Sequence, residues 1–124
     1  MKFMVCKKCG NVIEVVKDKC PAISCCGEQM TELIPGTSDG AHEKHLPVIE
    51  QNGNNVIVKV GSVDHPMVDV HYIEWVAIET KNGMQRVNLK PEKVPKAEFV
   101  LADGDELVSA YAYCNLHGLW KTEA

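Results

Sequence analysis

The sequence lacks any apolar run of about 18 residues, so no segment of it is expected to span a membrane. It also leaves no room for the apolar core of a signal peptide, because Met1–Val5 runs straight into Cys6. A basic excess is missing as well, since the formal net charge is −4, which argues against nucleic acid as a partner. We therefore expect a cytoplasmic protein with neither a membrane nor a nucleic-acid partner.

A helical period of useful length is also absent. In its place, roughly seven short β-rich segments follow the first third of the chain, with turn signals about every 8–12 residues. Asn82-Gly83 suits a type I′ hairpin turn. This pattern predicts a mostly β protein that contains an immunoglobulin-like seven-stranded β-sandwich. An early strand offers no cysteine that could pair with Cys114, so an inter-sheet disulfide is excluded. The expected strands are a segment from about Val48, then 55–60, 71–80, 85–89, 97–101, 107–113 and 119–121.

Six cysteines without an export signal favour metal ligation over disulfides. Four of them form two closely spaced pairs, Cys6-x2-Cys9 and Cys25-Cys26, each followed by a glycine. Four thiolates suit tetrahedral zinc or iron. A segment of fewer than ~40 residues buries too little core to fold alone, so the metal and a partner chain must help to hold it together. The turn-rich stretch 35–40 divides the chain into expected domains 1–36 and 37–124.

The adjacent cysteine pair is informative, because zinc ribbons usually carry two Cys-x2-Cys knuckles. With this pair, the segment 1–36 resembles desulforedoxin, a small iron protein with four cysteine ligands. Cys20 has no place in that pattern. It is either a free cysteine in a turn or a ligand in place of Cys25. The alternative for the whole segment is a structural zinc site.

A second group of possible ligands lies in the predicted sandwich. Cys114 and His117 share one tight loop, and His45, His65 and His71 stand beside proline turns or at the start of an apolar run. Imidazoles and a thiolate suit iron, copper or zinc. Blue copper would require an axial methionine soon after the Cys-x2-His loop, and residues 118–122 contain none. Structural zinc would need only four ligands, whereas five leave one octahedral position open for a small molecule.

Taken together, these motifs resemble desulfoferrodoxin, the two-iron class of superoxide reductase, over essentially the whole chain. The resemblance implies a catalytic iron that reduces superoxide to hydrogen peroxide, a second iron in the first domain, a rubredoxin-type electron donor and a homodimer. It also implies that Cys114 is the axial ligand and that the histidines bind through Nε2, except His117 through Nδ1. The motifs are Cys6-x2-Cys9 with Cys25-Cys26, Glu43-Lys44-His45-x-Pro47, Gly61-Ser-Val-x-His65-Pro66, His71-x-Ile73-Glu74-Trp75 and Cys114-x2-His117-Gly-x-Trp120.

Two charged residues next to His45 are expected to serve the reaction. At ~5 Å and an effective dielectric constant near 20, Lys44 would attract superoxide by about 3 kcal/mol before screening, and it could relay a proton. Glu43 is implied by the resemblance to take the open iron position after the product leaves. We expect both in a loop before the strand near Val48, where the plain alternative is an exposed surface charge. Two other functions stay open, namely a non-catalytic two-metal electron carrier and a zinc-stabilised interaction module.

Overall fold

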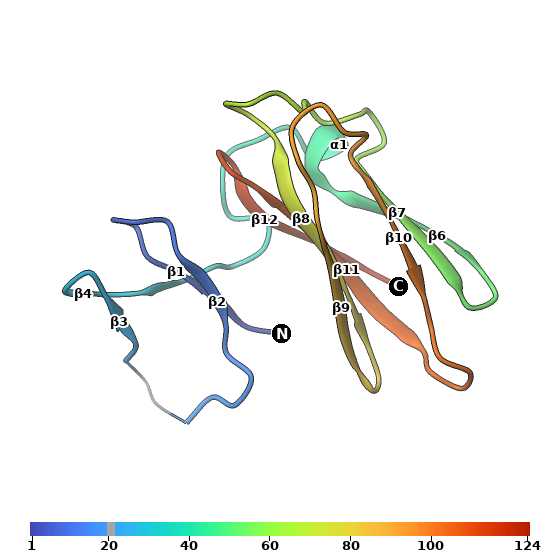
Figure 1. The fold of residues 1–124 in the computed structure, drawn as a ribbon, viewed down its shortest axis with the longest axis horizontal. Helices are drawn as coiled ribbons and strands as arrows, with labels where there is room; N and C mark the ends of the chain where they lie inside the picture. Colours follow the sequence, from blue (N-terminus) through green and yellow to red (C-terminus); the bar gives the residue numbers. More distant parts are fainter. Residues whose placement is uncertain (20–21) are drawn as a thin grey trace. The chain divides into compact units, whose positions relative to one another are not determined.

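The computed structural model describes residues 1–19 and 22–124, and nearly all of its regular structure is β (Figure 1). The chain separates into two compact units, Met1–Ile34 and Pro35–Ala124. Because each unit makes its own sheets and its own buried cluster, the two are described in turn. Cys20 and Pro21 lie outside the described residues, so the expectation that Cys20 is free stays a prediction.

The first unit is built from very short strands. Three of them, β1 (Phe3–Val5), β2 (Val12–Glu14) and β5 (Thr31–Glu32), form an antiparallel sheet in the order β2-β1-β5. The other two, β3 (Ser24–Cys25) and β4 (Glu28–Gln29), form a two-stranded hairpin. A small cluster of Met4, Cys6 and Met30 is buried between them. The unit therefore has little apolar core of its own.

The second unit confirms the predicted seven-stranded β-sandwich. One sheet has the strand order β10-β7-β6, and the other has the order β12-β11-β8-β9. All strand pairs within them are antiparallel. The strands are β6 (Pro47–Asn52), β7 (Asn55–Val60), β8 (Ile73–Thr80), β9 (Gly83–Asn88), β10 (Lys96–Val100), β11 (Leu107–Cys114) and β12 (Gly118–Glu123).

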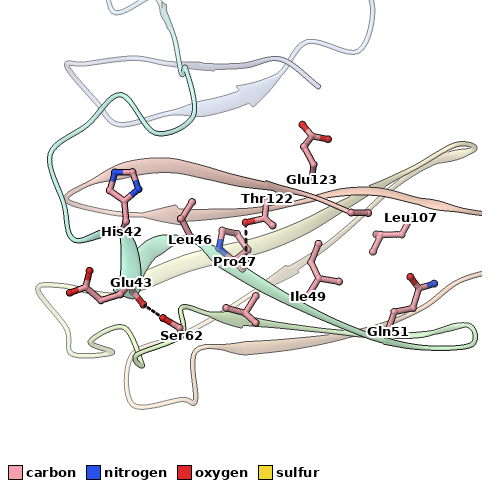
Figure 2. Close-up of a pocket in the computed structure, with 12 residues that line it drawn as sticks. His42, Glu43, Leu46, Pro47, Ile49, Gln51, Ser62, Leu107, Thr122 and Glu123 are labelled. Carbon is pink, nitrogen blue, oxygen red and sulfur yellow. Dashed lines mark hydrogen bonds between the residues drawn. The ribbon is translucent and has the colours of Figure 1, made fainter.

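The sandwich core lies between the inner faces of these two sheets. Alternate residues of β7, Val56, Val58 and Val60, are fully buried against residues of the second sheet such as Val76 and Ile78. Such two-residue alternation is what a strand with one buried face requires. Thr122 Oγ1 also donates a hydrogen bond of 2.7 Å to the Pro47 carbonyl, which ties β12 to β6 at the edge of the sandwich (Figure 2).

Two local predictions were wrong. Residues 42–45 form a single helical turn, α1 (His42–His45), closed by the Leu46 N–H on the His42 carbonyl, where we expected a loop. Neither Asn82 nor Gly83 has a positive φ, so the hairpin between β8 and β9 is not type I′. The neighbouring connection holds this turn instead, because Asp105 accepts the Asn82 N–H at 3.3 Å.

Candidate metal centres

The structure brings the four predicted cysteine ligands of the first unit together. All four sulfur atoms lie within 4.8 Å of one another, with Cys9 and Cys25 at 3.6 Å. The first knuckle is closed by the Gly10 N–H, which donates to the Cys6 carbonyl at 2.8 Å. In the second, Cys26 has a φ of 54°, a left-handed conformation that is rare for a residue with a side chain. This turn lets adjacent cysteines face one centre.

The thiols of this cluster differ strongly in acidity. Hydrogen bonding to the Cys9 backbone is the main cause that lowers the pKa of Cys6 to about 6. Hydrogen bonds to the other thiols, Cys9 first, raise the pKa of Cys26 to about 12. One thiolate therefore makes the next ionisation costly, because no positive charge compensates it. A thiophilic cation at the centre would replace these protons, so the four residues fit a tetrathiolate metal site.

The second cluster is assembled from four separate parts of the sandwich unit. His45 ends α1, while His65 and His71 lie in the long connection between β7 and β8. Cys114 is the last residue of β11, and His117 lies in the short loop before β12. The ligand atoms of all five lie within 4.8 Å of one another. The structure therefore brings together residues that are up to 72 positions apart.

The histidine nitrogens of this cluster face a common centre. His45 Nε2 lies 3.1 Å from both His65 Nε2 and His117 Nδ1. His45 Nδ1–H donates to the Ala41 carbonyl and His65 Nδ1–H to the Pro66 carbonyl, each at 2.7 Å. Because these bonds keep the proton on Nδ1, the two Nε2 atoms meet with lone pairs and cannot hydrogen-bond each other.

A further observation shows that the site fits a metal ion. His71 Nε2 is buried and has no hydrogen-bond partner among the residues that the structure describes. Buried polar atoms rarely lack a partner. A cation at the centre would satisfy this nitrogen and remove the repulsion between the lone pairs. Four imidazoles and one thiol are donors that iron accepts.

Burial sets the protonation of this second cluster. It is the main cause that lowers the pKa values of His45 and His71, and it lowers that of His65 to about 4. It is also the main cause that raises the pKa of Cys114. At neutral pH the imidazoles are therefore unprotonated and ready to bind, whereas the thiol must release a proton to become a ligand.

The position of α1 depends on a close backbone contact that sequence reasoning missed. The Glu43 carbonyl accepts the Val63 N–H at 2.9 Å and the Ser62 hydroxyl at 3.2 Å, and Figure 2 draws the second of these bonds. A Cβ atom on Gly61 would lie only 2.5 Å from this carbonyl oxygen. Glycine lets the two backbones approach, which brings His45 to the site. The only signal in the sequence was a glycine four residues before a ligand.

Lys44 and Glu43, the two predicted catalytic residues, are exposed on α1. After burial and His117, the positive charge of Lys44 is the third cause of the lowered His71 pKa, so its field reaches the cluster. Glu43 also borders a groove of about 600 Å³ along β6 and β12, and no ligand of the cluster is among its lining residues in the described part of the chain (Figure 2). The catalytic roles of both residues stay predictions.

The fold and the two clusters define a mostly β protein with one candidate site made of cysteines and another made of four histidines and a cysteine. In the described part of the chain, no helix is long and apolar enough to cross a membrane. The family model described as Desulfoferrodoxin matches residues 37–123. The chain belongs to the desulfoferrodoxin family, as its motifs predicted.

Relatives and solved structures agree with this assignment over nearly the whole chain. The sequence is 48% identical to a desulfoferrodoxin homolog of Archaeoglobus fulgidus, covering 98% of this chain and 96% of the relative. It is also 48% identical to the desulfoferrodoxin of Nitratidesulfovibrio vulgaris, covering 96% and 93%. The superoxide reductase structure from Treponema pallidum matches with a TM-score of 0.82 and 36% identity over 98% of both chains. The one-iron superoxide reductase from Giardia intestinalis covers 66% of this chain and 97% of its own, with a TM-score of 0.57 and 32% identity.

Proposed function

We propose that this chain is a superoxide reductase. In the reaction, superoxide takes up one electron and two protons and becomes hydrogen peroxide. The observation that carries the proposal is the convergence of four imidazole nitrogens and one thiol on a single buried centre. In this assignment, residues 37–124 form the catalytic domain, and residues 1–36 form a desulforedoxin-like domain whose four cysteines hold a second iron.

The residues of the second cluster would hold the catalytic iron, which supplies the single electron. Burial keeps the histidines neutral, so with the Cys114 thiolate they leave one positive charge on a ferrous site. Lys44 adds positive charge near the anionic substrate and can deliver a proton to the product. A focused positive field of this kind raises association rates by roughly 10- to 10³-fold. Glu43 competes for the open position once the product has left.

A rubredoxin-type protein is the proposed electron donor. Four aliphatic side chains are more than half exposed in the loops that carry His65, His71 and His117, and an apolar surface near a redox site suits a small, transient docking interface. These side chains are Val63, Val68, Val70 and Leu116.

We also propose a homodimer, because the first unit buries few residues by itself. The five described cysteines are all free, which suits the reducing cytoplasm.

The test is to mix anaerobically reduced, iron-loaded protein with superoxide and to measure hydrogen peroxide and dioxygen. We expect peroxide without dioxygen. We also expect Lys44→Ile to slow the reaction about tenfold and to flatten its salt dependence. Lys81→Ile, at the far end of β8, is the matched control and should leave both unchanged. Release of dioxygen would indicate dismutation instead and would contradict the proposal.

A non-catalytic electron carrier is the alternative function. A carrier needs no exchangeable coordination position, whereas the proposed enzyme requires one. Azide added to the oxidised protein should therefore change the visible spectrum of the second site. If azide has no effect and superoxide is not consumed, the carrier is the better description.

A further inference from the structure

The indole ring of Trp120 contacts two predicted ligands that come from different parts of the sandwich unit. Trp120 lies in β12, is fully buried and is three residues beyond His117. Its ring stacks on the His45 imidazole, with centroids 4.8 Å apart and planes 28° apart. Its Nε1–H donates a hydrogen bond of 3.1 Å to the His117 carbonyl. One side chain therefore links α1 to the loop between β11 and β12.

On the His45 side, the indole helps to set the plane of the imidazole. The Ala41 carbonyl fixes the direction of Nδ1 within that plane, and the stacked ring limits tilting out of it. A Cβ atom on Gly40 would lie 3.0 Å from His45 Cε1 and 3.2 Å from Trp120 Cζ2. The packing thus leaves no free room for an extra methyl group, so the imidazole has little freedom to move.

On the His117 side, the indole sets the main chain. The hydrogen bond to the His117 carbonyl orients the peptide that leads into Gly118, whose φ is 76°. This peptide belongs to the short loop that also holds Cys114. His117 Nδ1 then faces His45 Nε2 at 3.1 Å. A shift of the indole would therefore change the relative placement of the two histidines.

We propose that Trp120 is a positioning residue for the second metal centre. It sets the angle between the His45 and His117 ligands and thereby the geometry of the ion that they bind. The inference rests on metal binding at the site that the proposed function assigns, but it does not depend on superoxide as the substrate. It can therefore fail or hold independently of the catalytic assignment.

The test uses Co²⁺ as a spectroscopic probe in the full-length, metal-depleted chain. Trp120→Phe keeps an aromatic ring for stacking but loses the N–H donor, and Trp120→Leu loses both. Outer residues that orient ligands typically contribute about 10- to 100-fold to metal affinity. We expect a loss in this range for Trp120→Leu, a smaller loss for Trp120→Phe, and a shifted Co²⁺ absorption band of the second site in both. The bands of the cysteine site should stay unchanged and serve as an internal reference.

Phe99→Leu is the control for a general loss of packing. Phe99 is also buried, but it pairs with Val56 at the start of β7, whereas α1 approaches the far end of this strand at Gly61. The control should lower the melting temperature without moving the Co²⁺ band. An unchanged band and affinity in folded Trp120→Phe and Trp120→Leu would overturn the inference, as would an equal shift in Phe99→Leu. If Trp120→Leu does not fold, Trp120→Phe alone decides by its band.

Discussion

The two candidate metal centres are built in opposite ways. The cysteine centre takes its ligands from two turns between positions 6 and 26, next to strands of two or three residues. The histidine–cysteine centre takes its ligands from positions 45 to 117, at the end of a sandwich of much longer strands. In the described residues, the buried cluster of the first unit has three members, whereas that of the second has twelve.

This difference in core size indicates which of the two centres depends on its metal for structure. Burial of apolar surface is the main favourable term in folding, and three buried residues contribute little of it. One of the three, Cys6, is itself a predicted ligand. The sandwich, in contrast, orients His45 and His65 through hydrogen bonds to protein carbonyls without any metal. We infer that metal binding folds the first unit, whereas the second unit forms its site in advance.

Metal removal should therefore have the largest effect, and only on the first unit. After chelation, amides of β1 and β2 should lose their protection from hydrogen exchange, whereas those of β8 and β11 should keep it. Structural zinc sites contribute apparent binding free energies of about 10–16 kcal/mol, which this small unit cannot replace. Hydrogen exchange with mass spectrometry measures both regions at once.

Cys9→Ser should reproduce this loss without a chelator, because the exposed Cys9 contributes a ligand but no buried contact. Protection of β1 that survives in both experiments would contradict the comparison. Simultaneous loss in β8 and β11 would contradict it as well, since the sandwich would then also depend on metal.

Gly61→Ala should damage the second centre from outside its ligand set. The new Cβ would lie 2.5 Å from the Glu43 carbonyl oxygen, so α1 must move and carry His45 with it. Overpacking of this kind costs about 1–3 kcal/mol, and we expect at least a tenfold loss of Co²⁺ affinity at this site. Gly83→Ala is the control, because a Cβ there meets nothing within 4 Å. Equal Co²⁺ titrations for the two variants would show that the close approach is unimportant.

This contact illustrates what the sequence could and could not predict. The ligands were predictable because thiols and imidazoles at such spacings have few other uses, and the strands because alternation reflects one buried face. The helical turn at 42–45 was not, since four residues carry no period and the turn is held by tertiary bonds to Ser62 and Val63. The hairpin turn at 81–82 was mispredicted for the same reason, because Asp105 lies 23 residues further along.

The pH dependence of metal binding should also separate the two centres. In the first, the pKa values of Cys25 and Cys26 are raised, chiefly by hydrogen bonds to other thiols, so at least two protons must leave at neutral pH. In the second, burial lowers the pKa of His65 to about 4 and raises that of Cys114, so only the thiol proton must leave. Both affinities should rise with pH, with a slope of at least two per pH unit for the first centre and near one for the second.

Competition titrations with Co²⁺ from pH 6 to about 8 measure these slopes, since each site has its own absorption bands. Cys114→Ser provides the control, because it removes the thiol of the second centre and should leave the slope of the first unchanged. A slope near two at the second centre would show that a histidine is protonated at neutral pH, contrary to the effect of burial.

The smallest expected effect concerns a charge that the sandwich holds beside its metal centre. The pairing of β8 with β11 passes from Trp75–Tyr113 to Ile73–Cys114, so Glu74 is the extra residue of a bulge. Burial raises the pKa of Glu74 above its ordinary value of 4.5, and its negative charge contributes to the raised pKa of Cys114. The short strands of the first unit carry no comparable partly buried acid among the described residues with a shifted pKa.

Glu74→Gln should therefore remove a pH-dependent cost. Because the folded state holds the Glu74 proton more tightly than the unfolded chain, the wild-type protein loses stability as the pH rises above 4.5 and through the raised value. Glutamine stays neutral, so the difference in unfolding free energy between the variant and the wild type should grow in favour of the variant over this range. Urea unfolding followed by tryptophan fluorescence measures it, since Trp75 and Trp120 both lie in the second unit. Glu98→Gln, on an exposed position of β10, should give no such trend. A flat difference for Glu74→Gln would mean that the bulge leaves this carboxylate fully hydrated.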